Sequence, residues 1–271
     1  MSTRTHLVVG AGKMGGALLQ GWLASGIVSP TQLIILDPNP GQAASEAIEN
    51  GALHLSKPTN ELASVVYILL GIKPQMFTAL APDIAKKLSN DAVVISILAG
   101  TSLESLSEFF PRQRLIRAMP NTPAAIGKGI TAYTKGSDVS SEQAAMTEAL
   151  LSAGGSVHHV ENEHLIDVVT AISGSGPAYV FHMVEALEAA ALKIGMAAEL
   201  APDFARQTII GAAGLLETSD QSAATLRENV TSPNGTTQAA LDVLMGEDGL
   251  ASLMRETTKA ALKRAKELAK S

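Results

Sequence analysis

Short apolar runs alternate with amphipathic segments through the chain up to about residue 160. The apolar runs predict strands over 6–10, 33–37, 65–70, 93–98, 115–118 and 129–134, with weaker candidates over 52–55 and 156–160. Amphipathic segments over 14–25, 41–50, 75–88, 102–109 and 141–152 predict intervening helices. Residues 65–70 are nearly all apolar, as in parallel strands buried on both faces. This alternation predicts an α/β domain of the doubly wound, Rossmann type over 1–162.

The strand pattern stops near Glu163, and the remaining residues predict an all-α domain over 163–271. Helices are expected roughly over 163–195, 200–218, 222–229, 236–246 and 248–269. No Gly- or Ser-rich linker separates the halves, so we expect a helix to lead directly from one domain into the other. Several of these helices are apolar nearly all round, which favours burial against another subunit. An ordinary two-layer helical domain is the alternative.

Composition excludes several functional classes. Hydrophobic residues make up 46% of the 271 residues, enough for a sizeable core. The net charge of -6 argues against nucleic acid as a partner, because phosphate binding requires a basic surface. The absence of cysteine excludes disulfides, thiolate catalysis and cysteine-ligated zinc. The six histidines show no metal-ligand spacing, so no metal site is expected.

The location expected from the sequence is the cytoplasm. The residues from Met1 to His6 lead directly into a strand pattern without the apolar core of a signal peptide. The longest strongly apolar stretch, residues 65–72, is too short to span a bilayer. We therefore expect no membrane partner.

A G-x-G-x-x-G motif, Gly10-Ala11-Gly12-Lys13-Met14-Gly15, follows the first strand and opens the first helix. Gly10 permits the tight turn, Gly12 lets a pyrophosphate approach the backbone, and Gly15 allows close helix–strand packing. The second strand ends in Asp37, 22 residues after Gly15, where a carboxylate meets the ribose of NAD. The motif and its context predict dinucleotide binding.

The preference between NADH and NADPH stays open at this point. Asp37 favours NAD, because a carboxylate repels the 2′-phosphate of NADP. However, Asn39 and the backbone amides near it are hydrogen-bond donors that could still bind this 2′-phosphate.

Three further segments have both a structural and a functional interpretation. Lys73 and Pro74 follow the strand over 65–70. Lys73 can contact a cofactor phosphate at the carboxyl end of that strand or lie in solvent, and Pro74 suits the first residue of a helix. Asn121 lies between two prolines and can orient an amide such as nicotinamide, or belong to a rigid connection. The run Ser173-Gly174-Ser175-Gly176-Pro177 predicts a break, a kink or a close contact within a helical region.

The run Thr231-Ser232-Pro233-Asn234-Gly235-Thr236-Thr237 precedes an apolar helical pattern. Ser, Thr, Asn and Gly suit a helix N-terminus, where backbone N–H groups lack partners. Such a site attracts a small anion, for instance a substrate carboxylate, without any Arg or Lys. A turn with an N-cap is the simpler interpretation.

Together these motifs resemble the pyrroline-5-carboxylate reductase family over essentially the whole chain. The resemblance rests on residues 10–15, 72–74, 119–123, 173–179 and 230–237. In the family the last motif usually has glycine at the position of Asn234, and asparagine also tolerates left-handed backbone angles. The resemblance implies a Rossmann-type domain followed by a helical domain that interlocks two subunits into a homodimer, in the family often a decamer.

The resemblance also implies site residues. The substrate, 1-pyrroline-5-carboxylate, would be held by Ser232, Gly235, Thr236 and Thr237, with Thr237 as the candidate for a hydrogen bond to the ring nitrogen. For the cofactor, NADPH or NADH, the motifs already name Gly10, Gly12, Lys13, Met14, Gly15, Asp37, Asn39 and Asn121, and the resemblance implies Asn60, Ile72, Lys73, Pro74, Ala99, Gly100 and Asn229. Asn229 would come from the partner subunit, and Asn60 departs from the family's local spacing.

The implied reaction is hydride transfer to the imine carbon of 1-pyrroline-5-carboxylate, giving proline, in which the nicotinamide carries the chemistry. A related imine reductase or a β-hydroxyacid dehydrogenase would share the two-domain plan. The latter typically uses a lysine on the interdomain helix, where this chain offers only the distant Lys193. A non-catalytic NAD(P)H sensor is a third alternative, against which the polar run 231–237 argues.

Overall fold

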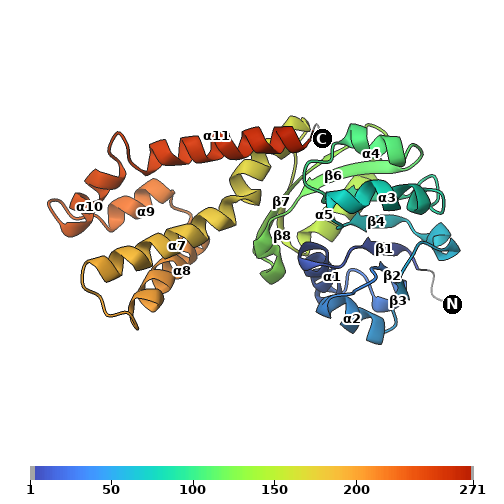
Figure 1. The fold of residues 1–271 in the computed structure, drawn as a ribbon, viewed down its shortest axis with the longest axis horizontal. Helices are drawn as coiled ribbons and strands as arrows, with labels where there is room; N and C mark the ends of the chain where they lie inside the picture. Colours follow the sequence, from blue (N-terminus) through green and yellow to red (C-terminus); the bar gives the residue numbers. More distant parts are fainter. Residues whose placement is uncertain (1–3, 270–271) are drawn as a thin grey trace. The chain divides into compact units, whose positions relative to one another are not determined.

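The structure is a computed structural model, and it describes residues 4–269. By its backbone contacts the chain forms two compact units. The first comprises Met1–Ser175 with Ala261–Ser271, and the second comprises Gly176–Ala260. The ribbon is drawn in Figure 1.

The first unit is built on an eight-stranded sheet of order β3-β2-β1-β4-β5-β6-β7-β8. The strands are β1 (His6–Val9), β2 (Leu33–Leu36), β3 (Leu53–Leu55), β4 (Tyr67–Leu70), β5 (Val93–Ser96), β6 (Arg114–Met119), β7 (Gly129–Lys135) and β8 (Gly155–His159). Strands β1 to β6 pair in parallel, β7 is antiparallel to β6, and β8 is parallel to β7. All eight predicted strands are confirmed, and the fold class is the predicted one.

Helices flank this sheet on both faces (Figure 1). They are α1 (Lys13–Ser25), α2 (Gln42–Glu49), α3 (Pro74–Ala85), α4 (Leu103–Phe109), α5 (Ser141–Ser152) and α6 (His164–Val169). Short 3-10 helices η1 (Pro30–Gln32), η2 (Asn60–Ser64) and η3 (Thr122–Ile126) link strands and helices.

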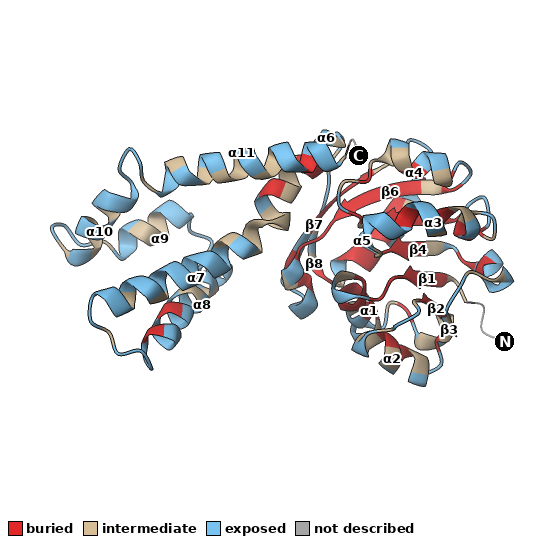
Figure 2. Ribbon diagram, viewed as in Figure 1, coloured by how far each residue is buried: buried red, intermediate tan, exposed pale blue. Residues whose placement is uncertain are grey.

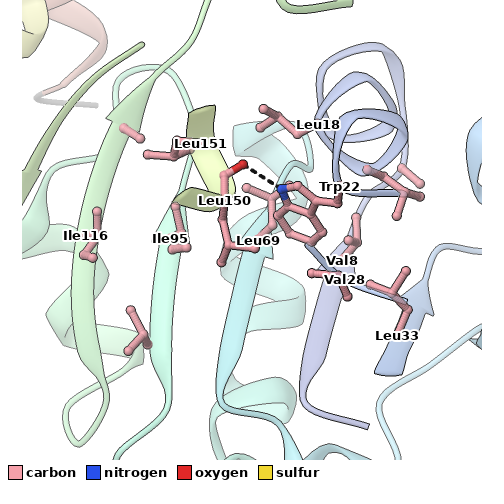
Figure 3. Packing of buried hydrophobic residues seen from close by; sticks show 14 of the residues in the cluster. Val8, Leu18, Trp22, Val28, Leu33, Leu69, Ile95, Ile116, Leu150 and Leu151 are labelled. Atoms are coloured by element: carbon pink, nitrogen blue, oxygen red, sulfur yellow. Dashed lines mark hydrogen bonds between the residues drawn. The ribbon is translucent and has the colours of Figure 1, made fainter. Parts of the chain in front are cut away.

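Alternate residues along the strands pack into two separate hydrophobic cores, one on each face of the sheet. Val8 belongs to the core under α1, α2 and α5, whereas its neighbours Leu7 and Val9 belong to the core under α3 and α4. Trp22 of α1 is 1% exposed, and its indole N–H donates to the Leu150 carbonyl of α5 at 2.7 Å (Figure 3). This double burial explains why the strands are apolar at consecutive positions.

The second unit contains α7 (Gly176–Lys193), α8 (Ala201–Thr218), α9 (Ala223–Asn229), α10 (Thr236–Leu244) and the first part of α11 (Leu250–Leu268). Figure 2 shows these helices mainly as exposed or intermediate, in contrast to the buried strands of the first unit. Helix α7 has no buried residue along its 18 positions, and α8 buries only Ala201 and Ala205. Among the described residues, no helix is both long and apolar enough to cross a membrane.

The single helix expected over 163–195 is interrupted. Helix α6 continues into a π-helical turn, η4 (Thr170–Gly174), before α7 begins at Gly176. The amide N–H of Ser175 donates to the Thr170 carbonyl at 2.9 Å, an i to i−5 bond. The run Ser173-Gly174-Ser175-Gly176-Pro177 predicts a break, a kink or a close contact in this region, and the structure has a π-helical turn there, an irregularity that glycine and proline favour.

Candidate active site

The glycine motif forms the turn between β1 and α1, and its first glycine requires a left-handed backbone. Gly10 has φ +82°, and a Cβ there would lie 2.7 Å from Ile72 Cγ2 and 2.9 Å from the Gly71 carbonyl carbon. Gly15 is equally confined, because a Cβ would collide with the Gly10 carbonyl oxygen. These contacts bring the ends of β1 and β4 together at the start of α1.

Gly12 differs from both, because it faces open space. Leaving aside its chain neighbours, no heavy atom of the described residues lies within 4 Å of the position its Cβ would take. Gly12 is also the N-cap of α1 and contributes no side-chain hydrogen bond there. Lys13, exposed, and Met14, partly buried, form the first turn. A helix N-terminus with open space in front is the arrangement that holds a pyrophosphate.

Asp37, just beyond β2, is tied to the glycine motif. Its Oδ2 accepts the Ala11 amide at 2.7 Å, and its Oδ1 accepts the Asn39 amide at 2.8 Å. Its backbone carbonyl is 2.8 Å from His54 Nε2. The carboxylate is therefore fixed beside the loop, and each oxygen keeps a lone pair for a ribose hydroxyl.

Two further loops follow parallel strands at the same edge of the sheet. Ile72 is half-buried after β4, while Lys73 is the exposed N-cap of α3 and Pro74 its first residue. Gly100, with φ +71°, follows β5 next to the exposed Ala99. A Cβ on Gly100 would lie 2.9 Å from Leu268 Cβ, so this loop packs closely on the end of α11.

The two predicted asparagines of the first unit lie in different places. Asn121 is 8% exposed after β6, and its Oδ1 accepts the Ile130 amide at 2.9 Å, which fixes the start of β7. Asn60 accepts from Lys87 Nζ at 3.3 Å. Because Lys87 lies between α3 and β5, Asn60 is at the amino ends of the strands. The structure thus does not bring Asn60 together with the glycine motif.

The run 231–237 forms a turn that leads into α10. The Gly235 amide donates to the Ser232 carbonyl at 3.0 Å across Pro233 and Asn234. Asn234 has φ +58° and is the one non-glycine residue with positive φ between residues 4 and 269. Proline followed by a positive φ is typical of a type II turn. Asparagine therefore keeps the left-handed turn at the position where the family usually has glycine.

Gly235 is the N-cap of α10 and brings no side-chain cap. A Cβ on it would lie 2.5 Å from Ser232 Oγ, so the serine hydroxyl rests directly against this glycine. Thr236 and Thr237 supply the first two residues of the helix, with Thr237 half-buried and Thr236 exposed. The structure thus gathers the predicted substrate residues at one helix N-terminus. Asn229, at the end of α9, donates through Nδ2 to Gln221 Oε1 at 2.9 Å.

One buried charge cluster was missed by the sequence reasoning. Arg117 on β6 has a side chain 3% exposed, and it pairs with Glu163 at 2.9 Å and Asp167 at 2.8 Å. The signal was an arginine inside an apolar strand, since a buried arginine needs carboxylate partners. Sequence alone does not show which carboxylates those are.

The predicted cofactor residues fit a dinucleotide at the glycine motif. Gly12 leaves room at the N-terminus of α1, Gly10 and Gly15 close the turn, and a fixed carboxylate stands where a ribose is expected. The turn before α10 in the second unit has the features of a helix N-terminus that suits a small anion.

Comparisons with known proteins point to one family. Residues 163–268 match the family model described as pyrroline-5-carboxylate reductase dimerisation, and residues 7–100 match one described as NADP oxidoreductase coenzyme F420-dependent. The pyrroline-5-carboxylate reductase of Synechocystis sp. is 38% identical to this chain over 97% of both. A solved pyrroline-5-carboxylate reductase of Coxiella burnetii has a TM-score of 0.90 at 30% identity, with 100% of each chain covered. The Plasmodium falciparum pyrroline carboxylate reductase, solved with NADP bound, has a TM-score of 0.83 at 27% identity over 99% of both chains.

The helical match also accounts for the exposed apolar side chains of the second unit. Phe181, Ile194 and Phe204 are 64%, 86% and 57% exposed in the single chain. A dimerisation domain covers such side chains with a second copy, so the chain forms a homo-oligomer. By its near-complete match to relatives that are 38% and 30% identical, the chain belongs to the pyrroline-5-carboxylate reductase family.

Proposed function

We propose that this protein reduces 1-pyrroline-5-carboxylate to L-proline with NADPH or NADH. The chain is similar to these reductases along its length. The observation that carries the proposal is that it also has both a glycine loop suited to a dinucleotide and a helix N-terminus lined with hydroxyls. When bound, the reduced nicotinamide supplies a hydride to the imine carbon, and the ring nitrogen of the product retains a proton. The protein's part is binding and orientation.

The substrate carboxylate binds at the N-terminus of α10 in this proposal. The Thr236 amide lies at the positive end of the helix, and Ser232 Oγ lies against Gly235, whose own amide closes the turn onto the Ser232 carbonyl. A carboxylate is stabilised at such a terminus without a cationic side chain. The left-handed Asn234 holds the turn that presents these donors.

Thr237 forms a hydrogen bond with the ring nitrogen through its hydroxyl, whose oxygen can accept from a protonated imine. No hydrogen bond of the Thr236 or Thr237 hydroxyl to another described residue occupies these groups in the single chain. A protonated imine accepts hydride readily, so a positioned hydroxyl is enough and no general base is required. Hydride transfer depends on a fixed orientation of the substrate. A single well-placed hydrogen bond that holds this orientation therefore has a large effect on the rate.

The cofactor residues of the first unit take the roles that their places allow. Gly12, Lys13 and Met14 bind the pyrophosphate, and Asp37 meets the adenosine ribose. Because Asp37 is held by two backbone amides beside the loop, its negative charge stays close to the ribose 2′ position. We therefore propose a preference for NADH. Asn39 provides the alternative contact through which NADPH binds.

The remaining cofactor residues lie on the later strands. The loops that follow β4, β5 and β6 contain six of them: Ile72, Lys73, Pro74, Ala99, Gly100 and Asn121. They bind the nicotinamide half, because the two halves of a dinucleotide lie on either side of the point where the strand order reverses. Asn60, which the resemblance places near the adenosine ribose, lies at the amino ends of the strands against Lys87 and is left out of this set. Asn229 is proposed to reach the nicotinamide from the partner subunit.

Domain roles and assembly follow the same reasoning. Residues 1–162 form the dinucleotide-binding domain, and residues 163–271 form the substrate and dimerisation domain. We propose that the homo-oligomer is built from dimers, which can assemble further into decamers. The reaction is placed in the cytoplasm, without nucleic acid or membrane partners.

An initial-rate assay tests the proposal. Purified protein is given 1-pyrroline-5-carboxylate with NADH and then with NADPH, and the loss of absorbance of the reduced cofactor is followed. We expect proline as the product with at least one cofactor. Turnover of a β-hydroxyacid with NAD in place of the imine would instead support a dehydrogenase, and tight cofactor binding without turnover of either would support a sensor.

A further inference from the structure

The buried cluster around Arg117 joins three segments of the first unit. Arg117 lies on β6 and is 2% exposed. Its Nη1 donates to Glu163 Oε1 at 2.9 Å, and its Nη2 donates to Asp167 Oδ1 at 2.8 Å. Both carboxylates come from the start of α6. Two charge-assisted bonds from one planar guanidinium fix the direction of α6 relative to β6.

Glu163 also reaches the loop that follows β5. The same Oε1 atom accepts the Leu103 amide at 2.8 Å, and Leu103 is the first residue of α4. That amide is one of the N–H groups that a helix leaves without an internal partner. Glu163 therefore anchors the end of the short loop 97–102, which contains Ala99 and Gly100.

Arg117 also lies on the strand that leads to the Asn121 turn. It lies four residues before Asn121, whose side chain accepts the Ile130 amide. Beyond Asp167, α6 passes into the π-helical turn η4, and a Cβ on Gly174 would lie 3.8 Å from Met119 Sδ. The ion cluster is thus bonded to the start of α4, which follows the loop after β5, and it lies on the segments that lead to the turn after β6 and to η4.

These segments belong to one half of the sheet. With the strand order 3-2-1-4-5-6, the adenosine half of a dinucleotide lies over β1 to β3 and the nicotinamide half over β4 to β6. The glycine motif and Asp37 are on the first side, and the Arg117 cluster is on the second. A change in the cluster should therefore act on one end of the cofactor.

We propose that Arg117, Glu163 and Asp167 are positioning residues that fix the Ala99–Gly100 loop for the nicotinamide end of the cofactor. This inference rests on the proposed function. None of the three residues is assigned contact with the cofactor. They act through the loop that they hold.

The test compares binding of the whole cofactor with binding of its adenosine end. Full-length wild type and Glu163→Ala are titrated with NADH or NADPH, whichever binds more tightly, and with ADP-ribose or its 2′-phosphate as the matching fragment. We expect Glu163→Ala to weaken the whole cofactor by about tenfold, the size of one lost charge-assisted hydrogen bond, and to leave the fragment unchanged. Steady-state assays should show a higher KM for the cofactor.

Conservative variants separate positioning from simple loss of folding. Glu163→Gln keeps an oxygen that accepts the Leu103 amide, so it should bind the whole cofactor more tightly than Glu163→Ala. Arg117→Lys keeps the charge but loses the two-pronged contact, so it should show the same split between cofactor and fragment. If Glu163→Ala does not fold, these two variants decide the question.

A matched control lies on the same strand. Arg114 also contacts two carboxylates, Asp91 and Asp138, each at 3.3 Å, but at the amino end of β6. Asp138→Ala should leave the affinities for both the cofactor and the fragment unchanged. Equal weakening of cofactor and fragment in Glu163→Ala, or unchanged binding of both, would overturn the inference. These titrations need no substrate, so failure of the reductase assay would be a separate result.

Discussion

Gly12→Ala separates cofactor binding from folding. Gly12 has φ -73° and ψ -159°, angles that alanine adopts without strain. No heavy atom outside its chain neighbours lies within 4 Å of the new Cβ among the described residues. The free protein therefore accommodates the methyl group, and the group that it obstructs is the pyrophosphate.

The expected changes differ greatly in size. Alanine is a poorer N-cap than glycine, and we expect a loss of about 0.5 kcal/mol in the free energy of unfolding. In a chain of this size that lowers Tm by about 1–2 °C. A methyl group that displaces the pyrophosphate from one backbone amide removes a charge-assisted bond of about 1.5–3 kcal/mol. The Kd for NAD(P)H should then rise by about 10- to 150-fold.

Calorimetric titration with NADH and NADPH, together with thermal unfolding of the free protein, measures both effects. Gly15→Ala is the contrasting variant, because its Cβ would collide with the Gly10 carbonyl oxygen. Overpacking of that kind costs about 1–3 kcal/mol, so Gly15→Ala should lose stability even without cofactor. If Gly12→Ala bound both cofactors as tightly as wild type, the pyrophosphate would not lie at Gly12.

The other predictions concern the substrate, the cofactor preference and pH. Thr237→Ala should lower kcat by about 100-fold with an unchanged Kd for the cofactor, whereas Thr237→Ser should keep most activity; near-wild-type rates in the alanine variant would remove the role given to Thr237. Asp37→Ser removes the charge that repels a 2′-phosphate and should shift the ratio of kcat/KM for NADPH over NADH upward by about tenfold, and an unchanged ratio would contradict that role. Burial lowers the pKa of His6 to about 4, so between pH 6.5 and 4 the unfolded chain takes up a proton that the folded chain does not. The free energy of unfolding should therefore fall by about 3 kcal/mol as the pH drops from 6.5 to 4. His6→Phe keeps an aromatic ring against Tyr67, so denaturant unfolding of this variant should show a smaller fall over the same pH range.

Local patterns were enough to predict most of the first unit. Consecutive apolar residues identify strands such as β4, since both faces of a parallel sheet are covered. The glycine spacing and the place of Asp37 predict the loop, because each position has a steric or electrostatic reason that depends on near neighbours. The antiparallel direction of β7 was not predicted, as nothing in the run 129–135 specifies its direction.

The sequence does not identify side-chain partners that lie far apart along the chain. Arg117 is recognisable as a buried charge, yet its carboxylates lie 46 and 50 residues later in the chain. Asn60 resembles a family residue by type, but the local spacing differs and its side chain accepts from Lys87 instead. Asn234 is the opposite case, because its left-handed φ depends on the local Pro-Asn-Gly sequence and could be anticipated.

The second unit shows why the apolar pattern of the later helices could not be explained within one chain. Helix α7 has the composition of a buried helix, yet none of its residues is buried, and Phe181 is 64% exposed. A monomer with such a surface would aggregate, because exposed apolar area of this extent is stable only when covered. The cover is a second copy of the same domain, in agreement with the dimerisation match over residues 163–268. The folding energy of this unit therefore comes in large part from association, and its stability should depend on protein concentration while that of the sheet core does not.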